Sequence, residues 1–445
     1  MSISSPPHGY SAARLVRDYT HQIELSGGER LVFNLLTGLA WQGPANEAVD
    51  AGTAVERDEG GAEASHALEN LEAEFQDSPH PLSFQLIPTY GCNFSCAYCY
   101  EGSLTSKQKQ WTPLEIAQVV SACTHLAAES GRELEKASFT VLGGEVIRSE
   151  TFKGVETLVS ALYDAGARRF EAITNGFELA EHAAAMKAMG IGRVQITVDG
   201  PRAIHDKRRP VRLVRESSFE RILDGIEACL GLGVLVNLRV NIDQRNIPHL
   251  PDLFEVFDSR GWLDDPLFRG YLAPLERDYA GKMYFAPEDE MARMLVAQAE
   301  KNPLLLRFRW DIHGLDFLYA IRSGHRPRLK MRYCGATRSD YMLDARNGVY
   351  ACWFGAGQDQ FKLADISEVA THGKLPEKGR RKLNEWRSRG PTVMPHCSSC
   401  KWSLICGGGC AYKAAVKTGG LSSPNCAPFA GIFEAAGKTI YEHQR

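Results

Sequence analysis

Residues 82–99 read LSFQLIPTYGCNFSCAYC and govern the interpretation of the rest of the chain. The first eight residues have the apolar, strand-like character of a buried strand, and a loop with three cysteines follows at once. Cys92, Cys96 and Cys99 offer three thiolates, close enough to bind one metal centre. A structural zinc site usually takes four ligands, whereas an iron-sulfur cluster with three cysteine ligands leaves one iron open. The loop therefore favours a cluster over a zinc knuckle, since no fourth Cys or His stands nearby.

Downstream of this loop, strand-like runs alternate with stretches of helical periodicity. Six strands are predicted, at 82–89, 137–142, 169–174, 193–198, 235–240 and 266–275. Amphipathic helices are predicted between them, at 113–130, 154–166, 179–190, 218–233 and 249–261. Such units build an open doubly wound sheet or a barrel, and both place function at the carboxyl ends of the strands. Polar and glycine-rich motifs follow the strands there: the cysteine loop, Gly143–Glu145, Asn175–Gly176, Asp199–Gly200 and Asn241.

Composition limits the classes of protein to consider. The 445 residues are 44% hydrophobic and 24% charged, which excludes collagen, coiled coil and wholesale disorder. The net charge of −3 argues against a nucleic-acid partner. No apolar run approaches the roughly 20 residues of a membrane span, and the start lacks signal-peptide features, so we expect a cytoplasmic protein without a membrane partner. Twelve cysteines then indicate metal or redox chemistry, with Cys123 and Cys229 expected in the core.

The pattern of Cys92, Cys96, Tyr98 and Cys99 resembles the signature of the radical S-adenosylmethionine (SAM) enzymes, and the resemblance spans about residues 83–430. In that family the open iron binds SAM, and reduction cleaves SAM to a 5′-deoxyadenosyl radical that abstracts hydrogen from the substrate. The implied fold is α/β, a partial (β/α)6 TIM barrel over 81–310, which agrees with the six strands. A small N-terminal α+β module (1–80) and a C-terminal cysteine-rich auxiliary-cluster domain (311–445) would flank it.

Several rim motifs match the family residue by residue. Gly143–Glu145 is similar to its Gly-Gly-Glu segment, where the backbone approaches closely and the carboxylate can pair with the SAM ammonium; Val146 stands where Pro is common. Thr197 resembles the Ser of a Ser-x-Asp-Gly pattern, and Arg209 the Arg of a His-Asp-x-x-Arg element that contacts the SAM carboxylate. The implied cofactor-binding residues are Tyr98, Gly143, Gly144, Glu145, Asn175, Thr197, Arg209 and Leu272. We expect the neighbouring cations to form a solvated face: Lys207, Arg208, Arg212 and Arg215.

A second set of cysteines resembles the seven-cysteine SPASM extension of these enzymes, which holds two auxiliary four-iron clusters. Its members are Cys334, Cys352, Cys397, Cys400, Cys406, Cys410 and Cys426. One departure is that three residues, where four are common, separate Gly348 from Cys352. The resemblance assigns Cys397, Cys400, Cys406 and Cys426 to the distal cluster, and Cys334, Cys352 and Cys410 to the nearer one. Seven thiolates cannot fill eight positions, so the nearer cluster would have an open iron or a non-cysteine ligand. A zinc ribbon at residues 397–410 is the alternative.

Enzymes with this extension act mostly on peptides or proteins. One class comprises maturases that cross-link or epimerise ribosomally made peptides, and the other anaerobic sulfatase-maturing enzymes that form formylglycine. In the latter an Asp follows the cysteine that closes the first SPASM segment, whereas Trp353 and Phe354 follow Cys352 here, which favours a cross-linking maturase. No catalytic base is identified, because Asp340 and Asp344 are expected in turns.

The partners follow from the same resemblance. A precursor peptide would be the substrate, and its leader could add a strand to the N-terminal module. That module is predicted to contain a hairpin at 21–38, an acidic linker at 50–77 and a short helix near 67–75. A flavodoxin or ferredoxin would donate electrons, and the auxiliary clusters would accept them from the substrate. A non-enzymatic iron-sulfur protein and a zinc interaction module are the alternatives outside the enzymes.

Overall fold

The computed structural model describes residues 19–36, 38, 40–46, 70–73, 75, 80–212, 216–275 and 285–443. The chain divides into two compact units. The larger unit contains residues 80–316, 334–388 and 428–445, and the smaller contains 1–79, 317–333 and 389–427. Most of the predicted acidic linker, and Arg215, lie outside the described residues, whereas residues 70–73 and 75 of the predicted short helix are helical. No helix of the described part is long and apolar enough to cross a membrane.

The larger unit is built on a sheet in which the six predicted strands all occur. They are β4 (Ser83–Ile87), β5 (Ser138–Val141), β6 (Arg169–Thr174), β7 (Ile191–Thr197), β8 (Leu235–Ile242) and β9 (Phe268–Pro274), parallel and adjacent in chain order. Strand β10 (Arg309–Trp310) extends the sheet beyond β9. On the other side β11 (Asp340–Asp344) pairs parallel with β4, and the antiparallel strands β12 (Gly348–Tyr350) and β13 (Ala364–Asp365) follow. The carboxyl ends of the parallel strands therefore meet along one edge.

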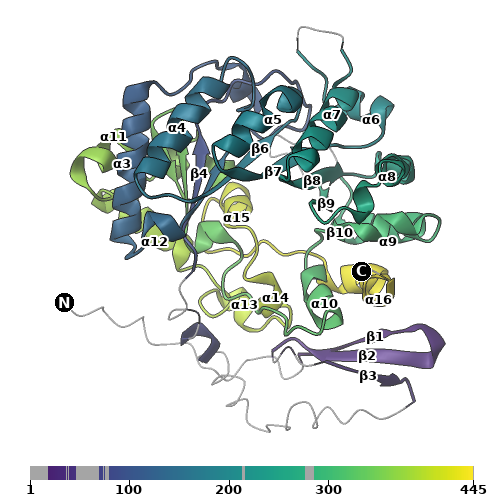
Figure 1. The fold of residues 1–445 in the computed structure, drawn as a ribbon. Coiled ribbons are helices and arrows are strands. Elements are labelled where there is room, and N and C mark those ends of the chain that lie inside the picture. Colours follow the sequence, from purple (N-terminus) through teal and green to yellow (C-terminus); the bar gives the residue numbers. More distant parts are fainter. Residues whose placement is uncertain are drawn as a thin grey trace. The chain divides into compact units, whose positions relative to one another are not determined.

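Helices connect these strands and lie on the outer side of the strand row (Figure 1). They are α3 (Pro113–Glu129), α4 (Phe152–Asp164), α5 (Leu179–Ala188), α6 (Arg202–Arg208), α7 (Ser218–Gly231) and α8 (Leu250–Ser259). Helix α3 begins with a reciprocal cap in which the Glu115 amide donates to Thr112 and the Thr112 amide donates to Glu115. Cys123 and Cys229 are fully buried on α3 and α7, which confirms that they belong to the core.

The remaining helices of the larger unit surround this core. Helices α9 (Glu288–Ala299) and α16 (Phe429–His443) pack on one another, and α11 (Ile366–His372) packs on α3. Helix α12 (Glu377–Arg387) carries surface ion pairs from Arg380 and Arg381 to Glu377. Helix α10 (Leu315–Arg322) begins in the larger unit and ends in the smaller one.

The two faces of the parallel sheet differ in chemistry. On β8, Val236 and Leu238 are fully buried, whereas Asn237 and Arg239 are partly exposed. A similar alternation occurs on β4 and β6, and the residues of the face opposite the helices include Gln85, Thr140, Glu171, Gln195, Arg239 and Tyr271. Parallel sheets are usually apolar on both faces. This polar set, called the inner face below, therefore indicates a face built to bind something other than a helix.

The smaller unit joins the first strands of the chain to the later cysteine-rich segment. Strands β1 (Thr20–Glu24), β2 (Glu29–Asn34) and β3 (Ala40–Pro44) form an antiparallel sheet, and β1 and β2 are the predicted hairpin around Gly27 and Gly28. Both glycines have positive φ, which explains their use in the turn. Short helices α13 (Pro395–Ser398), α14 (Ser403–Cys406) and α15 (Ala411–Thr418) carry the cysteine segment. Arg389 holds this segment by donating to backbone carbonyls, including Gly408 at 2.7 Å.

Candidate active site and cysteine clusters

The cysteine loop after β4 rests directly on the end of β5. The Gly144 amide donates to Thr89 (3.1 Å) and the Glu145 amide to Gly91 (2.8 Å). A Cβ atom on Gly144 would lie 2.1 Å from the Tyr90 carbonyl oxygen, so only glycine permits this approach. The close backbone approach expected of the Gly-Gly pair is thus made to the cysteine loop, which these glycines hold in place.

The three thiols of this loop lie close enough to influence one another. Burial raises the pKa of Cys92 to about 12, and the negative charges of Glu145, Cys96 and Cys99 add to the effect. Burial likewise raises the pKa of Cys99 to about 11. Three such thiolates can coexist only beside a cation, and metal binding would release their protons. This donor set fits an iron-sulfur cluster, which distributes its cysteines over different irons; in the described part, no three Cys, His, Asp or Glu side chains are set to ligate one single ion.

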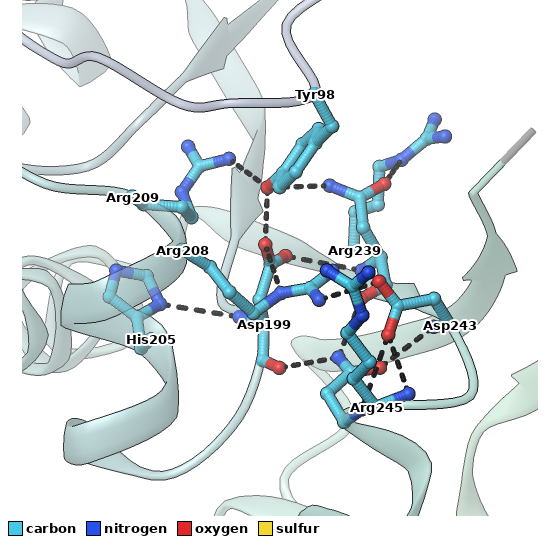
Figure 2. Close-up of polar contacts among 10 residues, drawn as sticks. Tyr98, Asp199, His205, Arg208, Arg209, Arg239, Asp243 and Arg245 are labelled. Atoms are coloured by element: carbon cyan, nitrogen blue, oxygen red, sulfur yellow. Dashed lines mark hydrogen bonds and ion pairs between the residues drawn. The ribbon is translucent and has the colours of Figure 1, made fainter. Parts of the chain in front are cut away.

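Tyr98 occupies the centre of a buried hydrogen-bond network at the strand ends (Figure 2). Its hydroxyl group donates to the carboxylate of Asp199 and accepts from Arg209 Nη1 (2.9 Å) and Asn241 Nδ2 (3.3 Å). A phenol has one donor and two acceptor sites, so these bonds use its full capacity. The hydroxyl of Tyr98 therefore positions Arg209 and has no free site for a cofactor, although its ring and backbone remain candidates for such a contact.

Arg208 is part of the same network, which corrects the prediction that it lies on a solvated face. Its side chain is only 13% exposed and bridges Asp199 (Nε to Oδ2, 3.3 Å) and Asp243 (Nη1 to Oδ2, 2.8 Å). Arg212 also differs from the prediction, because it donates to the Phe94 carbonyl (2.6 Å) and to Thr105 (2.7 Å). Lys207 is exposed as expected. Arg208 is buried because the end of α6 lies at the strand ends, where the buried carboxylates of Asp199 and Asp243 require a cation.

His205 is hydrogen-bonded to the backbone of this network. Its ring is fully buried, and its Nδ1 accepts the Asp199 backbone N–H at 3.2 Å. Burial lowers the pKa of His205 to about 3, so the ring is neutral and acts as an acceptor there. The His-Asp-x-x-Arg segment thus fixes the backbone of Asp199 through His205 and its carboxylate through Arg208.

Glu145 is buried and connects β5 to β6. Its carboxylate accepts from Thr174 Oγ1 (2.7 Å), the Ile147 amide (2.8 Å) and the Asn175 amide (2.5 Å). Burial raises the pKa of Glu145 to about 7, although these hydrogen bonds oppose the shift. Asn175 in turn donates to Asn93 Oδ1 (2.7 Å) in the cysteine loop. The structure therefore brings together Glu145 and Asn175, two of the residues that the family motifs single out.

Two buried donors at this site fit a carboxylate-bearing cofactor. Arg209 Nε and Asn93 Nδ2 are buried without a hydrogen-bond partner among the described residues. Arg209 lies beside the cluster loop, since its charge lowers the pKa of Cys96 against the larger effect of burial.

Thr197 lies at the end of β7 and is nearly buried. Leu272 has no exposed surface on β9, so its predicted contact with adenine has no support from its position.

An exposed aromatic group joins the first cysteine loop to the Cys352 segment. Tyr100 is 51% exposed, and its ring meets Phe354 edge to face at 5.4 Å; Phe354 meets Trp353 at 5.9 Å. Although half of Tyr100 is exposed, loss of hydration is the main cause of its raised pKa, to which the thiolates of Cys99 and Cys352 contribute. This aromatic bridge (Tyr100, Trp353, Phe354) therefore lies between two cysteine sites.

The cysteines of the smaller unit form a group of four. Burial raises the pKa of Cys406 to about 12, with contributions from the charges of Cys397, Cys426 and Cys400. The pKa of Cys397 is raised to about 11 by burial and by Cys400 and Cys426. These are the four residues that the family pattern assigns to the distal cluster, and their proximity fits a single four-iron centre. Cys410 also belongs to the smaller unit, whereas Cys334 and Cys352 belong to the larger.

Asp344 and Asp340 differ in role. Asp344 is fully buried, and its Oδ1 accepts the Arg346 (3.1 Å) and Gly348 (2.8 Å) amides in the turn between β11 and β12, as predicted. Its other oxygen accepts the Tyr90 hydroxyl at 2.7 Å. Asp340 begins β11 and receives Gln85 Nε2 at 3.4 Å, so it lies in a strand and not in the expected turn.

Comparison with known proteins finds a family match within the parallel-sheet region. Residues 86–256 match the model of the Radical SAM superfamily. A GTP 3′,8-cyclase of Rhizobium etli is 25% identical over 171 residues, which cover 38% of this chain and 46% of that protein. The chain thus spans about half the length of the curated relatives it matches.

Two solved structures share the fold over more of the chain. Native anSMEcpe with bound AdoMet has a TM-score of 0.61 at 19% identity, covering 81% of this chain and 98% of that one. Streptococcus suis SuiB bound to precursor peptide SuiA has a TM-score of 0.54 at 13% identity, covering 93% and 99%. This chain therefore shares the fold of both structures over most of its length.

Proposed function

We propose that this chain, whose residues 86–256 form a radical SAM domain, is a SPASM-type maturase that oxidatively cross-links a ribosomally made precursor peptide. When bound, SAM and the cluster at Cys92, Cys96 and Cys99 would supply a 5′-deoxyadenosyl radical for hydrogen abstraction. The observation that carries the proposal is the aromatic bridge, because it puts Cys352 beside the first cysteine loop. An auxiliary centre at that position would lie within reach of the same substrate.

The residues around the first loop are suited to hold SAM. Arg209 is a buried cation with an unpartnered Nε, and Tyr98 fixes its orientation, so it would bind a carboxylate. Glu145 supplies a buried negative charge close to Cys92, which suits an ammonium group. The cation and the anion flank one loop and match the two charges of an amino acid.

The chemistry of the cross-link requires a sink for an electron. Joining two residues removes two hydrogen atoms from the peptide: the radical takes one, and the other leaves as a proton and an electron. The four thiols around Cys406 and the set containing Cys334, Cys352 and Cys410 would hold the two auxiliary centres that accept the electron. A flavodoxin or ferredoxin would supply the electron that reduces the first cluster, and a cytoplasmic location stays a prediction.

The substrate class is inferred from the site surroundings. The inner face offers hydrogen-bonding groups such as Gln195 and Tyr271, which bond one another at 2.8 Å and could exchange this bond for a peptide. SuiB, whose fold is shared, is a protein with a bound precursor peptide. In the smaller unit β1 and β3 are edge strands, the kind of element to which a leader peptide could add a strand.

A sulfatase-maturing activity is the second candidate, since the fold of anSMEcpe is also shared. Trp353 and Phe354 follow Cys352 where those enzymes would have a catalytic Asp, and the aromatic bridge leaves no carboxylate next in sequence to that cysteine. This observation favours the peptide maturase. The relationship to GTP 3′,8-cyclases covers only about half of those proteins, and no feature of the described inner face favours a nucleotide.

The test is anaerobic reconstitution followed by metal analysis and a peptide assay. We expect about twelve irons per chain, falling to about eight when Cys92, Cys96 and Cys99 are replaced by Ala. Reduced protein should cleave SAM, and a matching precursor peptide should lose two hydrogen atoms by mass spectrometry. Zinc with little iron would refute the radical SAM proposal. Conversion of a sulfatase-derived peptide, with no change in precursor peptides, would establish the second candidate.

A further inference from the structure

Arg239 and Asp311 carry opposite charges at one end of the parallel sheet, yet they form no ion pair with one another. Arg239 is on β8, where its Nε donates to Asn241 Oδ1 at 2.7 Å. In Figure 2 the end of its guanidinium group points away from the other residues drawn. Asp311 directly follows β10, and its carboxylate accepts no hydrogen bond from the described residues. Both side chains therefore keep hydrogen-bonding capacity for a ligand.

The register of the strands places these two side chains on either side of Tyr271. Arg239 is paired with Tyr271 across β8 and β9, and Tyr271 is paired with Arg309 across β9 and β10. Side chains alternate along a strand, so Asp311 lies on the same face as Arg309, one pleat closer to the carboxyl ends. The Asp311 amide continues the ladder by donating to the Leu272 carbonyl at 2.8 Å. Asp311 therefore extends the inner face beyond Tyr271.

The exposure of these residues agrees with that placement. Asp311 is exposed, whereas Trp310, which precedes it on the opposite face, is only 1% exposed. The guanidinium carbon of Arg239 lies 5.7 Å from the centroid of the Tyr271 ring. Although Asp311 is exposed, the surrounding protein removes part of its hydration, which raises its pKa, and the positive charge of Arg239 opposes the shift. The two charged groups therefore border one space, with the Tyr271 ring between their strands.

A guanidinium and a carboxylate on either side of an aromatic ring are complementary to a peptide bond. The C=O and N–H groups of a trans amide point in opposite directions, so one amide over the ring can accept from Arg239 and donate to Asp311. Hydrogen bonds to ionised groups are the strong ones. A phosphate or a free carboxylate is less suitable, because Asp311 would repel it, and Arg239 would repel an ammonium group.

We propose that Arg239 and Asp311 bind one backbone amide of an extended segment of the substrate peptide over Tyr271. This inference rests on the peptide substrate of the proposed function. Arg239 is joined to the predicted cofactor residues through Asn241, which accepts from Arg239 and donates to Tyr98 at 3.3 Å. An amide held there sets which residue of the peptide faces the first cysteine loop. Because the contact is made to the backbone, it tolerates different side chains in the bound segment.

The experiment uses anaerobically reconstituted full-length protein and a displayed library of short peptides as the probe. The library is first depleted on the double variant Arg239→Met/Asp311→Ala and then selected on wild type. The affinity of a selected peptide is measured by fluorescence anisotropy. Replacing one amide of this peptide by an ester, which removes the N–H donor, should weaken binding to wild type by about 10- to 100-fold, the value of one hydrogen bond to a charged group. The same ester should have no effect on binding to Asp311→Ala.

Single variants test each half of the site. Arg239→Met should weaken binding of the unmodified peptide by about 10- to 100-fold, and Asp311→Asn, which keeps an acceptor oxygen, should bind better than Asp311→Ala. Arg269→Met and Asp258→Asn are the matched controls, because Arg269 is exposed one pleat nearer the amino end of β9 and Asp258 is exposed on α8. Both controls should bind the peptide as wild type does. Equal iron content in all variants shows that the fold is intact.

The remaining outcomes separate this inference from the proposed function. A depleted library without binders for wild type, or a peptide in which no single ester weakens binding, would overturn the role of the pair. Binding of GTP that is lost in Arg239→Met and strengthened in Asp311→Asn would replace the peptide by a nucleotide and also overturn it. Cross-linking with unchanged affinity in Arg239→Met and Asp311→Ala removes this inference alone. Peptide binding through the pair without SAM cleavage supports the site and refutes the proposed chemistry.

Discussion

Replacing Arg208 by Met removes the cation between two buried carboxylates and keeps a side chain of similar length. The side chains of Asp199 and Asp243 are 0% and 1% exposed, so water cannot replace the guanidinium. Removing one partner of a buried ion pair costs about 3–5 kcal/mol, because the other charge stays buried. We expect the free energy of opening of β7 and β8, which end just before these carboxylates, to fall by about that amount in Arg208→Met.

Two further variants show which property of Arg208 matters. Arg208→Lys keeps the charge, but one ammonium cannot bridge both carboxylates, so the loss should be about 1.5–3 kcal/mol, that of one charge-assisted hydrogen bond. Lys207→Met is the matched control, because Lys207 precedes Arg208 on α6 and is exposed. Its effect should stay within about 0.5 kcal/mol.

Hydrogen exchange followed by mass spectrometry is the appropriate assay, because it reports the opening of individual strands in a chain of two units. Peptides covering 191–197 and 235–242 should lose protection in the order Arg208→Met, Arg208→Lys, Lys207→Met. Affinity for SAM should fall in the same order, since Asp199 holds the Tyr98 hydroxyl that orients Arg209. Equal protection in Arg208→Met and Lys207→Met would show that the network adds no stability and would refute this reasoning.

Three other outcomes are expected. Gly144→Ala places a Cβ atom 2.1 Å from a backbone carbonyl and should abolish iron binding at the first loop, whereas Gly154→Ala in α4, with its nearest contact at 3.7 Å, should stabilise the chain by about 0.5–1 kcal/mol in urea unfolding. Tyr98→Phe leaves Asp199 without one donor and should cost about 1–3 kcal/mol, with weaker SAM binding by calorimetry; unaltered binding would contradict the role given to the hydroxyl. Burial raises the pKa of Asp340 from 3.8 to about 6, so the folded state holds this proton more tightly than the unfolded chain. Its contribution to stability is therefore present below about pH 4 and lost as the pH rises through 6, and the unfolding free energy of wild type relative to Asp340→Asn should fall over that range.

The periodic part of the fold could be predicted from the sequence, because local patterns determine it. Apolar runs such as 235–240 and amphipathic stretches such as 218–233 contain the information that forms β8 and α7. The resemblance to the SPASM extension likewise implied which thiols would gather around Cys406. In both cases the interacting residues are close in sequence or repeat a regular pattern.

What could not be predicted depends on contacts between distant segments. Arg208 stands in a run of cations, and only the three-dimensional position of Asp243 shows that it is buried and paired. Asp243, the acidic residue that directly follows β8, was the available signal, since a buried carboxylate at a strand end needs a cation.

The composition of the smaller unit has a consequence for synthesis of the protein on the ribosome. Strands β1 to β3 emerge before the larger unit, but Trp402, against which His21 stacks, emerges only after most of that unit. At about 5–20 residues per second the nascent sheet waits for tens of seconds for this part of its partner. Iron loading at Cys397, Cys400, Cys406 and Cys426 must come after that delay, so a ribosome that stalls before residue 389 leaves β1 without the segment that covers it. The packing of β1 therefore depends on completion of a segment more than 350 residues later in the chain, so truncated chains cannot bury this strand in the same way.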